Sequence, residues 1–152
     1  MRTFATNTSY LLDLASVDRA KKGVVYPAET IYIQISAHNK STETPFLLLK
    51  EPATLDTKFA VITPRDDSFI PCYFCLALNV AAEEWLRTTV GSNINISMND
   101  FKIMTIVYTT DKAIQQSVVD VIEAIDEEIN YIKANISFTK TTKRWLMNKM
   151  FV

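Results

Sequence analysis

The sequence predicts an α+β fold, in which a β-rich N-terminal region of mixed short elements is followed by one long C-terminal helix that forms a coiled coil. Three observations support this prediction. All five prolines and both glycines lie before Thr109, and a segment that lacks both residue types is typical of a helix. Isoleucine alternates with other residues in one early segment, as in a strand with one buried face. A regular heptad of apolar residues runs through the C-terminal tail.

Composition places the chain among folded globular proteins. It has 152 residues, of which 48% are hydrophobic, which excludes intrinsic disorder. This length makes one ordinary domain with an appendage, and we predict a body at residues 1–110 and a helix at residues 111–152. The formal net charge of −1 removes the usual electrostatic argument for nucleic-acid binding, which is a strongly basic domain.

The elements of the predicted body follow from short patterns. Residues 30–36 alternate isoleucine with other residues and predict a strand, and residues 46–50 and 58–63 predict two more strands, separated by a turn at Glu51 and Pro52. A last strand is predicted at residues 103–108, leading into the long helix.

A helix is predicted at residues 71–89. Cys75, Leu78, Ala82 and Trp85 share one face of it, and Pro71 suits its first turn. Residues 91–93, which begin with Gly91, are expected to end it.

The C-terminal tail carries the clearest periodicity. Asp111 is a plausible N-cap, and a helix from Lys112 to Lys149 would be roughly 57 Å long. Spacings of four and three residues alternate along its apolar seam, which consists of Val118, Ile122, Ile125, Ile129, Ile132 and Ile136. Length and regularity favour a helix–helix contact, although packing of the seam on the chain's own body is the commoner explanation of such stripes. Parallel and antiparallel pairing both remain open.

No motif for catalysis or for a cofactor is present. The sequence lacks a glycine-rich phosphate loop, H-E-x-x-H and G-x-S-x-G, so we expect no cofactor and no metal. Cys72 and Cys75 form a C-x-x-C pair. The functional interpretation of such a pair is redox or zinc chemistry. Core packing explains them better, because there is no second pair and Cys75 lies on the apolar face of a predicted helix.

The expected location is the cytoplasm. The longest apolar runs, such as residues 46–49, are far shorter than a membrane span, and the first residues lack the apolar stretch of a signal peptide. Two cysteines are too few for a disulfide scaffold, which suits a reducing compartment. We therefore expect no membrane partner.

Basic and amide side chains recur in three loop-like places, and these are residue types that contact phosphates and read base edges. Taken alone, each cluster is equally typical of an ordinary solvent-exposed loop. The candidate DNA-binding residues are Arg19, Lys21, Lys22, His38, Asn39, Lys40, Asn93 and Asn95.

The chain resembles the specificity subunit of type I restriction–modification systems. The resemblance covers nearly the whole chain and is carried by several segments in the family's order. The segment from Gly23 to Ala37 is similar to the start of a target recognition domain. The other matching segments are 12–15, 91–96 with 101–103, 115–126 with its Gln115-Gln116 pair, and the terminal 143–151.

In that family each target recognition domain reads half of a bipartite DNA site, and two helices pack antiparallel as a spacer. A full subunit carries two domains and two helices, whereas this chain carries one of each. The resemblance therefore implies a half-size, non-catalytic subunit that dimerises through Val118, Ile122, Ile125, Ile129, Ile132 and Ile136. Its partners would be double-stranded DNA and the methyltransferase and restriction subunits that it directs.

Two other functions fit parts of the sequence. A coiled-coil protein-interaction module would use the helix without DNA binding, and salt-dependent, sequence-selective DNA binding separates it from the first function. A thiol enzyme would use Cys72 and Cys75, and would lose activity when both are replaced by serine.

Overall fold

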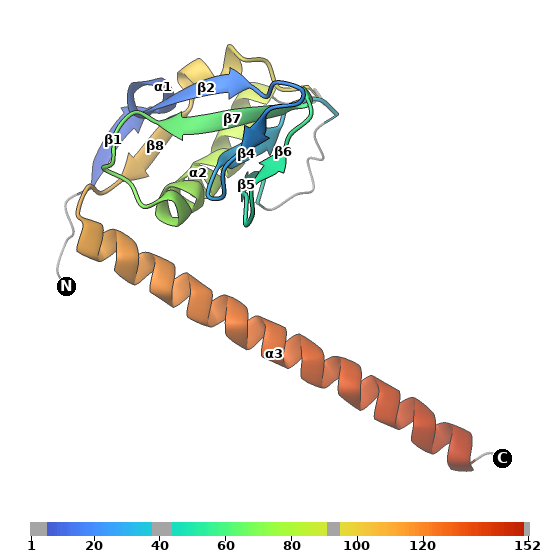
Figure 1. The fold of residues 1–152 in the computed structure, drawn as a ribbon. Helices are drawn as coiled ribbons and strands as arrows, with labels where there is room; N and C mark the ends of the chain where they lie inside the picture. Colours follow the sequence, from blue (N-terminus) through green and yellow to red (C-terminus); the bar gives the residue numbers. More distant parts are fainter. Residues whose placement is uncertain (1–5, 38–43, 91–94, 151–152) are drawn as a thin grey trace. The chain divides into compact units, whose positions relative to one another are not determined.

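The computed structural model describes residues 6–37, 44–90 and 95–150 (Figure 1). The chain divides into two units: a body that ends at Gln116 and a helical segment from Ser117 onward. The body therefore includes the first turn of the C-terminal helix, α3 (Lys112–Met150), whereas the predicted boundary lay after residue 110.

Within the described residues, the body contains three antiparallel sheets. The largest has the strand order β2 (Ala15–Arg19), β7 (Phe59–Pro64), β4 (Ile31–Gln34), β5 (Phe46–Leu48). Two small sheets pair β1 (Asn7–Tyr10) with β8 (Thr105–Tyr108) and β3 (Val25–Tyr26) with β6 (Ala53–Thr54). The remaining elements are α1 (Leu11–Leu14), α2 (Pro71–Trp85), a π-helical turn (Leu86–Val90) and a 3₁₀ turn (Asp100–Ile103).

The core lies where α2 packs on the sheets. In β4 the alternation seen in the sequence buries Ile31 and Ile33. The aromatic ring of Trp85 on α2 lies 5.1 Å from that of Phe101 and 6.2 Å from that of Phe46, measured between centroids. Such aromatic pairs add stabilisation beyond their buried area, so they fix α2 against β5 and the 3₁₀ turn.

The α+β fold class is confirmed, with a β-rich body and one long C-terminal helix. β4, β5 and α2 fall inside the predicted segments, and β7 runs one residue past the predicted end at Thr63. The strand predicted at residues 103–108 is shorter, because the chain up to Ile103 forms the 3₁₀ turn. The expected helix end at residues 91–93 lies outside the described residues. β1, β2, β3, β6 and α1 were not predicted.

Two side chains fix the start of α3. The Asp111 carboxylate accepts the backbone N–H of Ala113 at 2.9 Å, so the predicted N-cap is confirmed. Gln115 is fully buried, and its Oε1 accepts the Ile70 N–H at 2.8 Å. Its Nε2 donates to the carbonyls of Ser68 and Thr109, each at 2.8 Å. One amide thus joins α3 to the segment before α2 and to the end of β8.

Replacing Gln115 with leucine should lower the free energy of unfolding by about 2–4 kcal/mol, because the half-buried Ile70 N–H and the buried Thr109 carbonyl lose their partner. Urea denaturation followed by circular dichroism measures this change. The matched control is Asn130→Leu, an exposed amide farther along α3, which should stay within about 0.5 kcal/mol. Equal effects of the two substitutions would contradict the assigned role of Gln115.

Candidate nucleic-acid interface

Parts of the chain that are distant in sequence meet at one end of the large sheet. The Ala20 N–H donates to the Phe59 carbonyl at 2.9 Å, just past the end of β2. The Ile35 N–H donates to the Lys58 carbonyl at 2.8 Å, just past the end of β4. The Ile96 N–H then donates to the Ile35 carbonyl at 2.8 Å. This end of the sheet therefore gathers three chain segments around β7.

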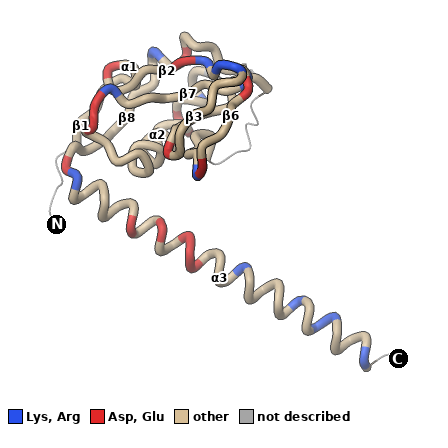
Figure 2. The backbone as a smooth tube through the Cα atoms, viewed as in Figure 1, with Lys and Arg blue, Asp and Glu red and all other residues tan. Residues whose placement is uncertain are grey.

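Four exposed cationic residues belong to these segments, and we call them the basic edge: Arg19, Lys21, Lys22 and Lys58. Lys21 and Lys22 lie in the turn between β2 and β3, which is closed by the Val24 N–H donating to the Lys21 carbonyl at 3.3 Å. Gly23 has a φ of 80°, a conformation that suits glycine. Figure 2 shows blue segments just past the end of β2.

Acidic residues temper the charge of the basic edge. Asp18 precedes Arg19 on β2, and Asp56 lies in the turn before Lys58; both are exposed. The Thr57 hydroxyl donates to Asp56 Oδ1 at 3.0 Å, which lowers the pKa of this carboxyl, and the Lys58 charge lowers it further. The basic edge is therefore mildly cationic. Such a charge suits phosphate contacts that supplement those of other subunits, rather than strong DNA binding by this edge alone.

Two amide side chains form hydrogen bonds with the backbone around Ala37. This residue has a φ of 52°, in the left-handed region that alanine rarely adopts. Its N–H donates to Asn95 Oδ1 at 3.0 Å. Gln34 Nε2 donates to the carbonyls of Ser36 and Ala37, at 2.9 and 3.1 Å. The carbonyl oxygen of the Asn95 amide is thus engaged by the backbone, which gives this predicted DNA-binding residue a structural contact.

The structure locates half of the predicted DNA-binding residues. Arg19, Lys21, Lys22 and Asn95 are exposed and belong to segments that meet at the end of the sheet. His38, Asn39, Lys40 and Asn93 lie outside the described residues. Lys58 was missed, because its place beside both β2 and β4 depends on the order β2-β7-β4, which the sequence does not reveal.

The seam of α3 is largely uncovered in a single chain. Ile122 is half-buried, and the exposed fractions of the other five side chains lie between 38% and 50%. Acidic residues occupy the first part of α3 and basic residues the last part, as Figure 2 shows in red and blue. An apolar stripe on a charged helix is the surface expected of a helix that has a partner.

The cysteine pair has the character of core packing. Cys75 is buried on α2, and burial raises the pKa of its thiol to about 12, with a further rise from Cys72. Because the thiolate is the nucleophile, a thiol with this pKa is inert at neutral pH. Within the described ranges, no three His, Cys, Asp or Glu residues come together to hold a metal ion.

At pH 8 iodoacetamide should alkylate Cys72 faster than Cys75, because Cys75 stays protonated and buried. Tandem mass spectrometry distinguishes the two sites, and both should react in guanidinium chloride. Above pH 9 the free energy of unfolding should fall, because the pKa of the Cys75 thiol is 9.0 in the unfolded chain and about 12 in the folded protein. Ionisation therefore favours the unfolded state in this pH range. Equal alkylation rates of the two thiols in the native protein would contradict the protection of Cys75.

The described part of the chain has no helix with the length and hydropathy needed to cross a membrane. No protein-family model matches the sequence, and no curated protein matches it.

A comparison of structures does find a similar fold. The chain is similar to the type I restriction–modification system S subunit from M. genitalium, with a TM-score of 0.60 and 14% sequence identity. The match covers 87% of this chain, which spans 42% of that protein. The chain therefore has the fold of somewhat less than half of a type I specificity subunit, as the resemblance in sequence predicted.

Proposed function

We propose that this protein is a half-size specificity subunit of a type I restriction–modification complex, which recognises DNA and contributes no catalysis. The observation that carries this proposal is the structural match to a specificity subunit over 87% of this chain but 42% of the other. Such a share corresponds to one body and one helix. Two copies would supply the pair of reading surfaces that a bipartite DNA site requires.

The basic edge supports the DNA-binding part of the proposal. Arg19, Lys21, Lys22 and Lys58 are exposed at one end of one sheet, although two segments distant in the sequence supply them. Lysine and arginine contacts to phosphates position a protein on a duplex, whereas base contacts give specificity. We infer that the basic edge faces the phosphate backbone and that partner methyltransferase subunits add the remaining contacts.

The seam supports pairing of two copies of α3. Its spacing is symmetric about Glu127, so an antiparallel pair buries every seam residue against another. The pairs are Val118 with Ile136, Ile122 with Ile132, and Ile125 with Ile129. Half-burying each of these side chains contributes about 1 kcal/mol, and two copies supply twelve of them, so roughly 10 kcal/mol favours association before its entropic cost.

Charge favours the antiparallel orientation of this pair. In a parallel pair, the basic turns from Lys140 to Lys149 lie against their own copies. In an antiparallel pair they lie apart, and Asp120 comes close to Lys133 of the other copy. The acidic residues around Glu127 repel one another in both orientations. Exposed charge pairs are worth about 0.2–1 kcal/mol each, so the seam sets the register and the charges choose the direction.

DNA recognition is tested by expressing the chain with the methyltransferase subunit of its own organism and sequencing the methylated DNA. We expect methylation at one bipartite motif, which disappears when the gene for this chain is deleted. Lys58→Gln and Arg19→Gln should each weaken DNA binding about equally for all sequences and reduce the salt dependence by about one phosphate contact. The control is Lys102→Gln, an exposed lysine of the 3₁₀ turn.

Unchanged methylation after deletion would overturn the proposal. Absence of salt-dependent DNA binding, with α3 pairing intact, would instead indicate a coiled-coil interaction module.

Pairing of α3 is tested by replacing Ile125 and Ile129 together with glutamate. The double variant should be monomeric by light scattering, since four carboxylates would enter the centre of the seam, whereas the wild type should be a dimer. Glu123→Gln is the control, because this residue lies off the seam and is exposed. A wild type that stays monomeric at high concentration would contradict the pairing.

A further inference from the structure

A strained residue lies beside the basic edge. Ala37 has a φ of 52°, and this left-handed conformation is costly for a residue that carries a Cβ atom. Because Ala37 is exposed, packing of its side chain does little to hold the conformation. Residues in such conformations persist only where other contacts enforce them, and they are concentrated at functional sites. The contacts around Ala37 therefore indicate what this part of the chain does.

Two amide side chains, Gln34 and Asn95, enforce the conformation of Ala37, and we call them the amide clamp. Asn95 Oδ1 accepts the Ala37 N–H at 3.0 Å, although the two residues are 58 positions apart. From the end of β4, Gln34 Nε2 donates to the Ala37 carbonyl at 3.1 Å and to the Ser36 carbonyl at 2.9 Å. Side chains from two distant segments thus bind both polar groups of the Ala37 backbone.

The segment held by the amide clamp is bonded to Lys58 of the basic edge. The Lys58 carbonyl accepts the N–H of Ile35 at 2.8 Å and that of Ser36 at 3.3 Å. The Ile35 carbonyl in turn accepts the N–H of Ile96 at 2.8 Å. Since Ala37 directly follows Ser36, its conformation affects the hydrogen bonds that hold the backbone of Lys58.

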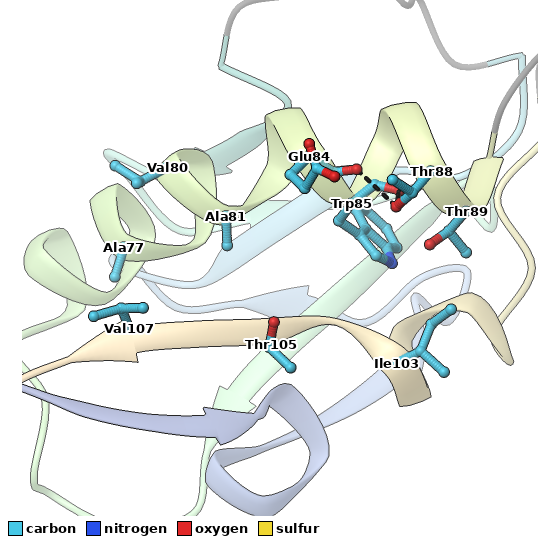
Figure 3. Close-up of a pocket in the computed structure, with 10 residues that line it drawn as sticks. All are labelled: Ala77, Val80, Ala81, Glu84, Trp85, Thr88, Thr89, Ile103, Thr105 and Val107. Atoms are coloured by element: carbon cyan, nitrogen blue, oxygen red, sulfur yellow. Dashed lines mark hydrogen bonds between the residues drawn. The ribbon is translucent and has the colours of Figure 1, made fainter.

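Helix α2 fixes the segment that carries Asn95. Trp85 lines the pocket between α2 and β8, and Figure 3 shows its side chain projecting from α2 toward β8. Its Nε1 donates to the Asp100 carbonyl at 2.8 Å. Asp100 Oδ2 accepts the N–H of Ser97, two residues after Asn95, at 2.7 Å. The Trp85 side chain therefore anchors the chain on which Asn95 lies.

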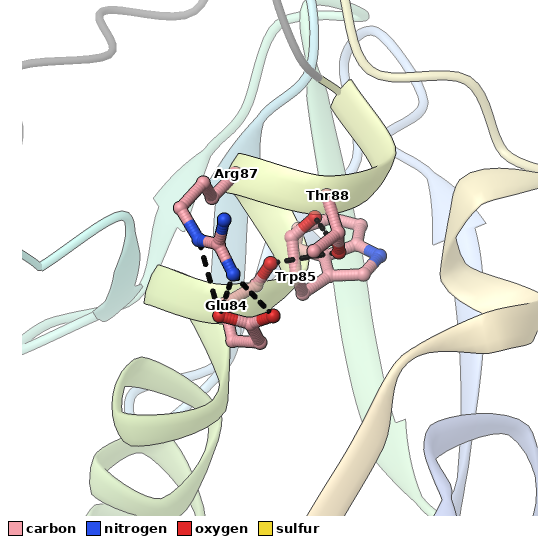
Figure 4. Close-up of polar contacts among 4 residues, drawn as sticks. All are labelled: Glu84, Trp85, Arg87 and Thr88. Atoms are coloured by element: carbon pink, nitrogen blue, oxygen red, sulfur yellow. Dashed lines mark hydrogen bonds and ion pairs between the residues drawn. The ribbon is translucent and has the colours of Figure 1, made fainter.

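Polar contacts also fix the end of α2 around Trp85 (Figure 4). The Arg87 guanidinium donates to both carboxylate oxygens of Glu84, each at 2.7 Å. The Thr88 hydroxyl donates to the Glu84 carbonyl at 2.8 Å. These contacts join α2 to the π-helical turn that follows it. The body therefore holds the segment of Asn95 without help from Ala37.

We propose that Asn95 is a positioning residue for DNA recognition. By holding Ala37 in the left-handed conformation, the amide clamp fixes the backbone of Lys58 for its contact with a phosphate. This inference rests on the proposed function and gives Asn95 a different role from the direct DNA contact that its residue type suggested. Preorganisation is the physical gain, because a contact that is already in place costs less ordering on binding.

The geometry of the Asn95 amide supports this role. Asparagine reads adenine through two hydrogen bonds, which use both the oxygen and the nitrogen of its amide. In this structure the oxygen already accepts the Ala37 N–H. Reading a base in this way would compete with the bond that holds Ala37.

The two roles of Asn95 predict different changes in DNA binding by the complex of this chain with its methyltransferase subunit. The probe is a duplex that carries the methylated motif, and its Kd is measured over a range of salt concentrations. Asn95→Ala should raise the Kd about fivefold and reduce the salt dependence as Lys58→Gln does, while the methylated motif stays the same. Asn99→Ala, at an exposed position of the same segment, is the matched control and should change none of these.

Two results of this measurement would overturn the positioning role. One is a motif that relaxes at a single base pair while the salt dependence stays unchanged, because Asn95 would then read a base. The other is an Asn95→Ala variant that binds DNA like the wild type. A complex that does not bind DNA at all would overturn the proposed function, and this inference with it.

Glycine at position 37 gives an independent test. Glycine adopts the left-handed conformation without the cost of a Cβ atom, so it depends less on the amide clamp. Ala37→Gly added to Asn95→Ala should therefore return the Kd to within about twofold of the wild-type value. A lost base contact would not be restored in this way.

Glu29→Gly is the matched control for this rescue. Within the described residues, Glu29 is the other non-glycine residue with a positive φ, 65°, and it lies at the opposite end of β4. Glu29→Gly should change the Kd of Asn95→Ala only as much as it changes that of the wild type. If Ala37→Gly does no better while Lys58→Gln still weakens DNA binding, the positioning role is overturned and the proposed function stands.

Discussion

The unpaired apolar seam of α3 is the constraint on which the rest of this structure depends. Isolated helices are marginal in water even when they are long, and most helical stability in proteins comes from burying an apolar face. Most seam residues of α3 remain 38–50% exposed in a single chain. The seam is also symmetric in its spacing, so the same stripe on a second copy satisfies it. In the proposed function, this pairing is what places two bodies of modest charge on one duplex.

Gln115 attaches the first turn of α3 to the body. A buried amide with three hydrogen bonds contributes little net stability, but it costs several kcal/mol when its partners are lost. Because these partners lie before α2 and at the end of β8, the first turn of α3 belongs to the body. The polar cluster around Gln115 therefore determines where α3 begins on the body.

Periodicity determined which parts of this fold could be predicted. The isoleucine alternation of β4, the apolar face of α2 and the heptads of α3 are local patterns, and each appeared in the structure. β3 and β6 have two residues each, and β1 and β2 pair with partners far along the chain, so no local pattern marks them. The candidate site shows the same division. Arg19 and Lys22 stand out as local basic clusters, whereas Lys58 joins them only through the order of the strands, and the Asn95 contact with Ala37 depends on tertiary structure.

The pairing of β1 with β8 has a consequence for how the molecule is made. Asn7 lies opposite Tyr108, so the first strand stays without its neighbour until almost the whole body has left the ribosome. Such a distant closure is slow because its chain entropy is lost before its contacts form. α3 follows directly and can wind into a helix much sooner than β1 and β8 can meet. Nascent chains that associate early would therefore join through their helices while their bodies are still incomplete.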